Sequence, residues 1–299
     1  MGFARKLGLG ALVVMAALGL THVANSASPS LGPRLDGSIR LATHNVHYIR
    51  LRATEGRWSV PDFERRKAAM DAVFKEADAD IVAFQEMESF GRGDTSGVNL
   101  ARDWLLSQNP GYAAAATGDP AVFPSTQPIF YRADMFEVTD QGWFFFSETP
   151  DIIYSRTYNG SYPAFASWAE FVSRDGAPFR VINVHFDSGN RENRARSAEL
   201  VAERIGPWID AGETVLLLGD LNSLIGWAPA DILRGAGLEF ANTPGSTFHF
   251  DRGFNLFGAI DHIGGTPDVT LAAPSVLREQ PGGVWPSDHY PVVTDAVLP

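Results

Sequence analysis

The feature that most restricts the fold of this chain is a repeated local pattern, in which a short apolar run is followed at once by polar, acidic or histidine residues. The runs are rich in β-branched and aromatic residues, which is typical of buried strands. Helical stretches separate some of the runs, which indicates sheets covered by helical layers. Other runs have no helix between them, so some antiparallel pairs are expected. The expected strands are 39–46, 81–84, 128–131, 166–172, 180–186, 214–218 and 290–296.

The clearest helical signal begins at Ser59. This serine resembles an N-cap, because proline follows in the first turn and apolar residues then repeat on one face. Further helices are expected at 99–108, 193–209 and 227–234. The aromatic run at 143–146 is assigned to the core or to a hairpin.

Residues 1–27 have the layout of a secretory signal peptide. Arg5 and Lys6 supply the positive start, residues 7–20 are apolar, and small and polar residues follow. The apolar run is shorter than the ~20 residues that a spanning helix needs. Cleavage near Ser26 or Ala27 predicts a secreted or periplasmic protein. Residues 28–37, rich in proline, glycine and serine, are interpreted as a flexible tether, and 38–299 as one domain.

Charge and cysteine content limit the chemistry. The chain has no cysteine, so disulfides and thiolate metal sites are excluded. Its formal net charge is −11, and −13 once Arg5 and Lys6 leave with the signal. This acidic balance makes a nucleic-acid substrate less favoured but does not exclude it, because the sequence has no basic stripe that could contact many phosphates. A bound cation can reverse the local field at a site.

Polar residues at six of the run ends are suited to metal binding or proton transfer. One such end alone is usually just solvated, but several buried carboxylates together are costly unless they are paired or hold a cation. Oxygen ligands favour Mg²⁺, Mn²⁺ or Ca²⁺ over structural zinc. His185 and His289 are then available to act on a phosphoryl group or to exchange protons. The oxygen ligands come from Asn45, Glu86, Asp220 and Asp288.

Together, these segments resemble the endonuclease/exonuclease/phosphatase superfamily, which has the deoxyribonuclease-I-like fold. The most specific parts are Gly-Asp-Leu-Asn at 219–222 and Ser-Asp-His-Tyr-Pro-Val at 287–292. Shorter matches occur in the right order at 43–46, 84–86, 183–187 and 260–263. The resemblance implies an α/β (α+β) fold: a four-layered αββα sandwich of two packed mixed sheets flanked by helices, with the site at one end.

The resemblance also implies which residues hold a metal ion. Glu86 is similar to the main metal carboxylate of the family, with Asn45 and Asp288 close to the same cation, expected to be Mg²⁺ or alternatively Mn²⁺ or Ca²⁺. Asp187 shares strand parity with His185, and orienting a neighbour is as good an interpretation for it as metal contact. Arg194 begins the helix after that strand, where it meets phosphate, ties the loop, or is simply an exposed helix charge.

The resemblance also implies five catalytic residues. Asp220 resembles the residue that orients or deprotonates the attacking water, or protonates the leaving oxygen. Asn222 is expected to hold the phosphate or a neighbouring catalytic group. His289, oriented by Asp261, is expected to contact a phosphoryl oxygen, and His185 to act on the phosphate or leaving group.

Two further histidines, and two positions where the sequence differs from the usual residues of the family, concern the edge of the site. Strand alternation sends His44 to the face opposite Asn45, and we discount both His44 and His47 as site residues. Residues 188–190 stand where family members often have a further histidine, and His262 where they commonly have tyrosine. Both departures affect the substrate pocket more than the hydrolytic centre.

The leading interpretation is an exported, divalent-metal-dependent phosphoester hydrolase, either a phosphodiesterase or a nuclease. One alternative is a phosphatase or phosphodiesterase acting on lipid headgroups or small molecules. Two alternatives belong to another functional class: a non-catalytic binding domain on the same fold, and a protein whose metal ion is purely structural. The expected partner is a phosphoester substrate: nucleic acid, a phosphorylated small molecule or a lipid headgroup. No obligate protein partner is inferred, and a monomer is expected.

Overall fold

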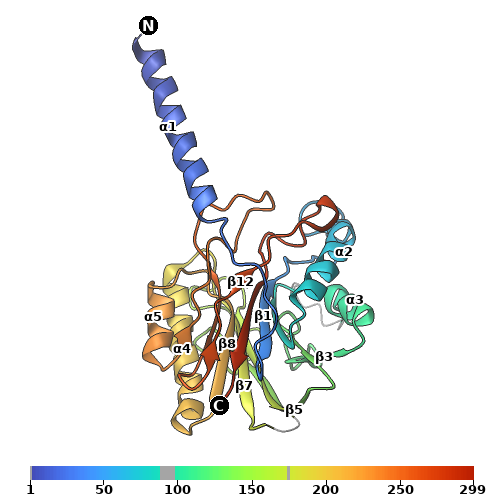
Figure 1. Ribbon diagram of the computed structural model, residues 1–299. Coiled ribbons are helices and arrows are strands. Elements are labelled where there is room, and N and C mark those ends of the chain that lie inside the picture. The colour runs from blue at the N-terminus through green and yellow to red at the C-terminus, as the bar shows by residue number, and fades with distance from the viewer. Residues whose placement is uncertain (1, 88–97, 174–175) are drawn as a thin grey trace.

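The computed structural model describes residues 2–87, 98–173 and 176–299 as two packed sheets between helical layers (Figure 1). Its helices are α1 (Gly2–Ala24), α2 (Val60–Ala77), α3 (Leu100–Gln108), α4 (Arg191–Asp210) and α5 (Ala228–Gly235), with a short 3-10 helix at Pro281–Gly283. Helices α2 and α3 cover one sheet, and α4 and α5 cover the other. The predicted four-layered αββα sandwich is therefore confirmed.

The first sheet contains one parallel pair in an otherwise antiparallel arrangement. Its strands are β1 (Ile39–Asn45), β2 (Ile81–Gln85), β3 (Tyr112–Ala115), β4 (Ile129–Arg132), β11 (Thr270–Leu271), β12 (Ser275–Val276) and β13 (Val292–Val297). The order is β11-β13-β1-β2-β4-β3, with β12 also paired to β13. Strands β1 and β2 are parallel, α2 connects them, and Asn45 pairs with Gln85. This register brings the carboxyl ends of the two strands together.

The second sheet also contains one parallel pair in an otherwise antiparallel arrangement. Its strands are β5 (Phe136–Phe145), β6 (Phe165–Ser173), β7 (Phe179–His185), β8 (Thr214–Asp220), β9 (Glu239–Phe240) and β10 (Asp261–Gly265), in the order β5-β6-β7-β8-β10-β9. Strands β7 and β8 are parallel, α4 connects them, and His185 pairs with Asp220. Each sheet thus contributes a β-α-β unit whose strands end in polar residues.

Apolar side chains fill the space between each pair of neighbouring layers. The cluster between the sheets includes Leu41, Val181 and Leu216, none of which is exposed. Burial of such side chains contributes about 1.5–3 kcal/mol each. Helix α2 begins as expected, since the Ser59 hydroxyl accepts a hydrogen bond from Asp62 N at 3.2 Å, and Phe63 of α2 lies in the cluster against the first sheet.

Helix α1 and residues 28–37 precede β1 in the chain. Helix α1 projects away from the domain (Figure 1). Among the described residues, no helix combines the length and apolarity needed to cross a membrane. Residues 28–37 form neither helix nor strand, yet they contact the domain. The Ser28 hydroxyl accepts from Val276 N at 2.7 Å, and Leu35 N donates to Asp295 at 3.0 Å.

Five charged residues form a group at the amino ends of β1 and β2, which we name the arginine-paired cluster. Arg40 Nε lies 2.7 Å from Asp295 Oδ1, and both side chains are buried. Asp80, also buried, accepts from Arg40 N at 2.7 Å and from Arg132 Nε at 3.0 Å, and it pairs with Arg34. Each carboxylate in this cluster therefore has a guanidinium partner.

Candidate active site

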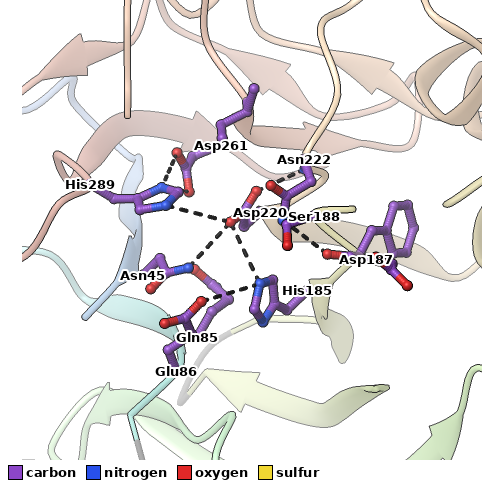
Figure 2. A network of polar contacts seen from close by, with 12 residues as sticks. Asn45, Gln85, Glu86, His185, Asp187, Ser188, Asp220, Asn222, Asp261 and His289 are labelled. Atoms are coloured by element: carbon purple, nitrogen blue, oxygen red, sulfur yellow. Dashed lines mark hydrogen bonds and ion pairs between the residues drawn. The ribbon is translucent and has the colours of Figure 1, made fainter. Parts of the chain in front are cut away.

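The candidate active site lies where the carboxyl ends of the two parallel pairs meet (Figure 2). Asn45 and Glu86 come from the ends of β1 and β2, and His185 and Asp220 from the ends of β7 and β8. Because β1 and β8 pack against each other across the core, these ends face one another. The site is therefore shared equally by both sheets.

The Asp220 carboxylate is the centre of this group. Its Oδ2 lies 3.7 Å from His185 Nε2 and 3.8 Å from His289 Nε2, and it accepts from Asn45 Nδ2 at 3.2 Å. His185 Nε2 is also 3.6 Å from Glu86 Oε1. The fold thus gathers four other predicted site residues around the buried carboxylate of Asp220.

Asp261 orients the second histidine as the resemblance implied. It opens β10 directly opposite Asp220, and its Oδ2 lies 2.9 Å from His289 Nδ1. This contact turns Nε2 of the same ring toward Asp220. Burial alone would lower the pKa of His289, but Asp261 and then Asp220 raise it well above its ordinary value. The imidazolium form is therefore favoured at this position.

The pKa values of the two buried aspartates are shifted in opposite directions. Burial, followed by the charge of Asp261, raises the pKa of Asp220 to about 6. Burial would also raise the pKa of Asp261, but His289 lowers it below the ordinary value. Among the described residues, no arginine or lysine forms an ion pair with Asp220. The groups in contact with this carboxylate in the described part of the chain are imidazoles and amide donors.

The donor set fits a hard divalent cation. Atoms of Asp220, Asp261 and His289 that can bind a metal lie within 4.8 Å of one another, and Glu86, outside this trio, has its Oε1 3.6 Å from His185 Nε2. Glu86 has a left-handed backbone (φ 54°), and its Oε2 accepts from Tyr48 N at 3.2 Å. Carboxylate and amide oxygens suit Mg²⁺ and similar ions, which would relieve the excess negative charge.

Asp288, the third predicted metal ligand, contacts groups of the protein. Its Oδ1 lies 2.9 Å from His47 Nδ1, and its Oδ2 accepts from Arg57 at 3.2 Å. Burial would raise the pKa of Asp288, but these neighbours hold it well below its usual range. The contact involves His47, which the sequence analysis discounted. Metal contact by Asp288 stays a prediction.

Asn222 and the loop after β7 form a further edge of the site. Asn222 has a left-handed backbone (φ 46°), and its side-chain amide donates to Phe186 O at 2.9 Å. Asp187 accepts from Asn190 N at 2.9 Å, and Arg194 donates to Asp187 O at 2.7 Å. The contacts of Asp187 and Arg194 therefore hold the loop at the start of α4.

A buried polar network lies beneath the site and joins the two sheets. Gln85 Nε2 of β2 donates to Asn183 Oδ1 of β7 at 2.7 Å, and Asn183 Nδ2 donates to Phe84 O at 2.8 Å. Gln85 and Asn183 are both unexposed. Because Gln85 precedes Glu86 and Asn183 lies two residues before His185, this network fixes the distance between the two sides of the site.

Histidines on the other faces of these strands lie outside the site. His44 packs against Phe84 on the side covered by α2, with 6.5 Å between ring centroids, and burial lowers its pKa to about 3. His262 contacts Ser223 O at 3.0 Å and the ring of Phe240. Both positions follow from strand alternation.

Several residues that serve the site were missed from the sequence. Tyr48 contacts Glu86 through its backbone, and Thr247 Oγ1 accepts from Asp261 N at 3.2 Å. Phe248 places its ring 5.1 Å from that of His289. These residues lie on loops, where neither periodicity nor a strand end marks a position as functional. Only nearness in sequence to Asn45 distinguishes Tyr48.

Known proteins share this architecture. A model of the endonuclease/exonuclease/phosphatase family matches residues 42–289. This chain belongs to that family. Its members are phosphoester hydrolases that depend on a divalent metal, and the resemblance inferred from the sequence is confirmed. No curated protein matches the sequence.

Solved structures of the family and its relatives superpose over most of the chain. A family protein from Bacteroides vulgatus is 24% identical, with a TM-score of 0.74 over 88% of this chain and 99% of that one. The mannosyl-6-phosphatase of Bacteroides thetaiotaomicron is 24% identical, with a TM-score of 0.70 over 87% and 100%. D. rerio TDP2, complexed with a single-strand DNA product, is 13% identical, with a TM-score of 0.61 over 87% and 99%. At these identities the likeness concerns the fold.

Proposed function

We propose that this protein is an exported, divalent-metal-dependent hydrolase of phosphodiesters. The observation that carries the proposal is the environment of Asp220, a buried carboxylate with two imidazoles and an amide around it and, within residues 2–87, 98–173 and 176–299, no guanidinium or ammonium ion-pair partner. A carboxylate placed only for stability would be paired, as those of the arginine-paired cluster are. The arrangement instead matches the needs of phosphoester hydrolysis: an oriented water, charge relief at phosphorus and help for the leaving oxygen.

In this proposal each side chain has a defined task. A divalent cation held by Glu86 and Asn45 would supply Lewis-acid stabilisation of the phosphoryl oxygens. Asp220, fixed by Asn45 and by Asn222 N, accepts a proton from the attacking water. His289, held as an imidazolium by Asp261, donates to a phosphoryl oxygen. His185 faces the leaving oxygen from the Glu86 side.

Two substrate classes follow from different observations. The net charge of −11 favours a small phosphorylated molecule or headgroup over a long polyanion, and the mannosyl-6-phosphatase has a similar fold. The TDP2 complex supports the nucleic-acid alternative. We place a phosphodiester first, because a diester can bring a leaving alcohol to His185 without a second phosphoryl charge beside Glu86.

The test is turnover of a substrate panel by the full chain with Mg²⁺, Mn²⁺, Ca²⁺ or a chelator. The panel holds duplex DNA, single-stranded DNA, RNA, bis(p-nitrophenyl) phosphate, p-nitrophenyl phosphate and sphingomyelin. We expect metal-dependent cleavage that Asp220→Asn abolishes and Asp231→Asn, an exposed control on α5, retains. Absence of turnover with every cation would favour the non-catalytic binding domain.

Export is part of the proposal, and it rests on the signal-like residues 1–27. N-terminal sequencing of protein recovered outside the cytoplasm is expected to begin near Ala27 or Ser28. A protein that stays in the cytoplasm with Met1 or Gly2 as its first residue would contradict this part alone.

A further inference from the structure

Tyr48 enters the active site because the chain turns sharply after β1. Asn45 Oδ1 accepts from His47 N at 3.1 Å, and His47 adopts a left-handed backbone with φ 65°. Residues other than glycine adopt this conformation in only a few per cent of cases, with asparagine, aspartate and histidine the most frequent, and it persists where surrounding contacts determine it. The turn ends the strand alternation, so the orientation of Tyr48 does not follow from that of β1.

Arg66 of α2 holds this turn in place. Its side chain is only 3% exposed, and it donates to Val46 O at 2.5 Å, to His47 O at 2.6 Å and to Pro286 O at 2.9 Å. The first two carbonyls belong to the turn, and the third precedes the segment that carries His289. A buried guanidinium whose donors satisfy three carbonyls fixes the two segments relative to each other.

The turn brings both ends of Tyr48 to the site. Its backbone N donates to Glu86 Oε2 at 3.2 Å, and its ring centroid lies 6.4 Å from that of His185. A phenol is uncharged below its ordinary pKa of about 10, so the side chain is a neutral hydrogen-bond donor.

Within residues 2–87, 98–173 and 176–299, the hydroxyl of Tyr48 has no hydrogen-bond partner. It is also not among the fully buried polar atoms that lack a partner. Most tyrosines in such partly buried positions direct the hydroxyl to an acceptor. By comparison, Tyr112 directs its hydroxyl to Ala79 O at 2.6 Å. The Tyr48 hydroxyl is thus left available to an acceptor that enters the site.

We propose that Tyr48 is a substrate-contacting residue whose phenol donates a hydrogen bond to a non-bridging phosphoryl oxygen, on the Glu86 and His185 side of Asp220. This inference rests on the proposed phosphoesterase function. A phenol suits the position because it donates without adding charge. An arginine or lysine there would pair with Glu86 and compete with the cation. The phenol and the imidazolium of His289 would bind the phosphoryl group from different sides.

The test compares Tyr48→Phe with Tyr112→Phe in the full chain. Tyr48→Phe removes one oxygen and keeps both the ring and the backbone donor to Glu86. For each variant, kcat/KM is measured with bis(p-nitrophenyl) phosphate and Mg²⁺, Kd for inorganic phosphate and for Mg²⁺ by calorimetry, and Tm by thermal unfolding. Tyr112→Phe is the matched control, because its hydroxyl lies away from the site.

We expect Tyr48→Phe to lower kcat/KM and to weaken phosphate binding by about 10-fold or more, the loss typical of one hydrogen bond to a charged acceptor. Its Mg²⁺ affinity and Tm should stay close to wild type, and Tyr112→Phe should keep wild-type kcat/KM. Unchanged kcat/KM and phosphate affinity in Tyr48→Phe would overturn the inference. Weakened Mg²⁺ binding with unchanged phosphate affinity would also overturn it, because the phenol would then serve Glu86. An inactive wild type would instead overturn the proposed function, and phosphate binding would still report on Tyr48.

Discussion

The two ends of β1 and β2 carry buried acidic groups with opposite chemistry. At the amino ends, the arginine-paired cluster gives Asp80 and Asp295 guanidinium partners at hydrogen-bond distance. At the other end of the sandwich, Glu86 after β2 and Asp220 at the end of β8 contact imidazoles and amides, and among the described residues neither forms an ion pair with arginine or lysine. Arginine is the residue best suited to neutralise a buried carboxylate permanently. Without such a pair, the charge of Asp220 is available for a cation and a proton.

The pKa values of Asp295 and Asp220, one at each end, are shifted in opposite directions. Burial would raise the pKa of Asp295, but Arg40 and Leu35 N lower it below the ordinary value. Burial and Asp261 raise the pKa of Asp220 to about 6. The arginine-paired cluster therefore stabilises the ionised form of Asp295, whereas the ionised form of Asp220 is disfavoured at the other end.

The largest expected effect is on turnover at the catalytic end. Asp220→Asn keeps the shape and the acceptor oxygen for Asn45 but removes the carboxylate that accepts a proton, so kcat should fall by about 10³–10⁴-fold. The measurement is steady-state hydrolysis of the best substrate in the panel. Asp295→Asn, at the other end, should keep wild-type kcat at temperatures where it is folded. Equal losses in the two variants would show that the comparison is wrong.

The next effect is on the stability of the arginine-paired cluster. Asp295→Ala leaves Arg40 buried without its partner, and removing one member of such a pair costs about 3–5 kcal/mol. Denaturant unfolding should report this loss in the free energy of unfolding. An Arg40→Met, Asp295→Leu double variant should recover much of it, because an apolar pair has no unpaired charge to bury.

A smaller effect of opposite sign is expected when the charge at Asp220 is removed. In chelator at pH 8, Asp220→Asn should raise the free energy of unfolding by about 1–3 kcal/mol, since it relieves the repulsion with Asp261. Saturating Mg²⁺ should stabilise the wild type more than this variant. Destabilisation by Asp220→Asn in chelator would mean that the carboxylate is structural.

The pH dependence of unfolding should separate the two ends further. For Asp220, whose folded pKa is raised, the stabilising contribution is complete below the ordinary pKa of 3.8 and is lost as pH rises through about 6. For Asp295, whose folded pKa is lowered, the contribution is present above 3.8 and is lost as pH falls through the folded value. In chelator, Asp220→Asn should remove a decline in stability between pH 5 and 7, on the order of 1 kcal/mol, and Asp295→Asn should not.

The smallest expected effect concerns Arg57, which pairs with Asp288 at 3.2 Å and Asp251 at 2.6 Å but is 56% exposed. Exposed ion pairs contribute about 0–1 kcal/mol, so Arg57→Ala should scarcely change the free energy of unfolding. A large loss, comparable to that of Asp295→Ala, would place Arg57 with the buried cluster instead.

The sequence was sufficient for the parts of the fold that are both apolar and regular. The expected strands at 39–46 and 214–218 correspond to β1 and β8, and the serine cap correctly placed α2. The long strand β5 was not delimited, because its middle residues are exposed at the sheet edge and only the aromatic run at its end resembles a buried strand. The two-residue strands β9, β11 and β12 are too short to produce any pattern.

The residues of the site also fall into those that the sequence could predict and those that it could not. Residues at strand ends, such as Asn45 and Asp220, could be predicted because parallel strands bring their carboxyl ends together. The contacts of His47, Tyr48 and Arg66 could not, because they depend on a left-handed turn and on a helix packed against it. Sequence spacing carries no information about either.

The division of the site between two β-α-β units, one in each sheet, has a consequence for the timing of activity. Neither unit alone holds both the Glu86 carboxylate and the Asp220 carboxylate, and a long stretch of chain separates them. A partly synthesised or partly folded chain therefore has no complete hydrolytic centre, even where one unit has formed. The proposed cleavage can begin only after the two halves dock, so a cell that makes this protein would not be exposed to that activity while the chain is still emerging and unfolded.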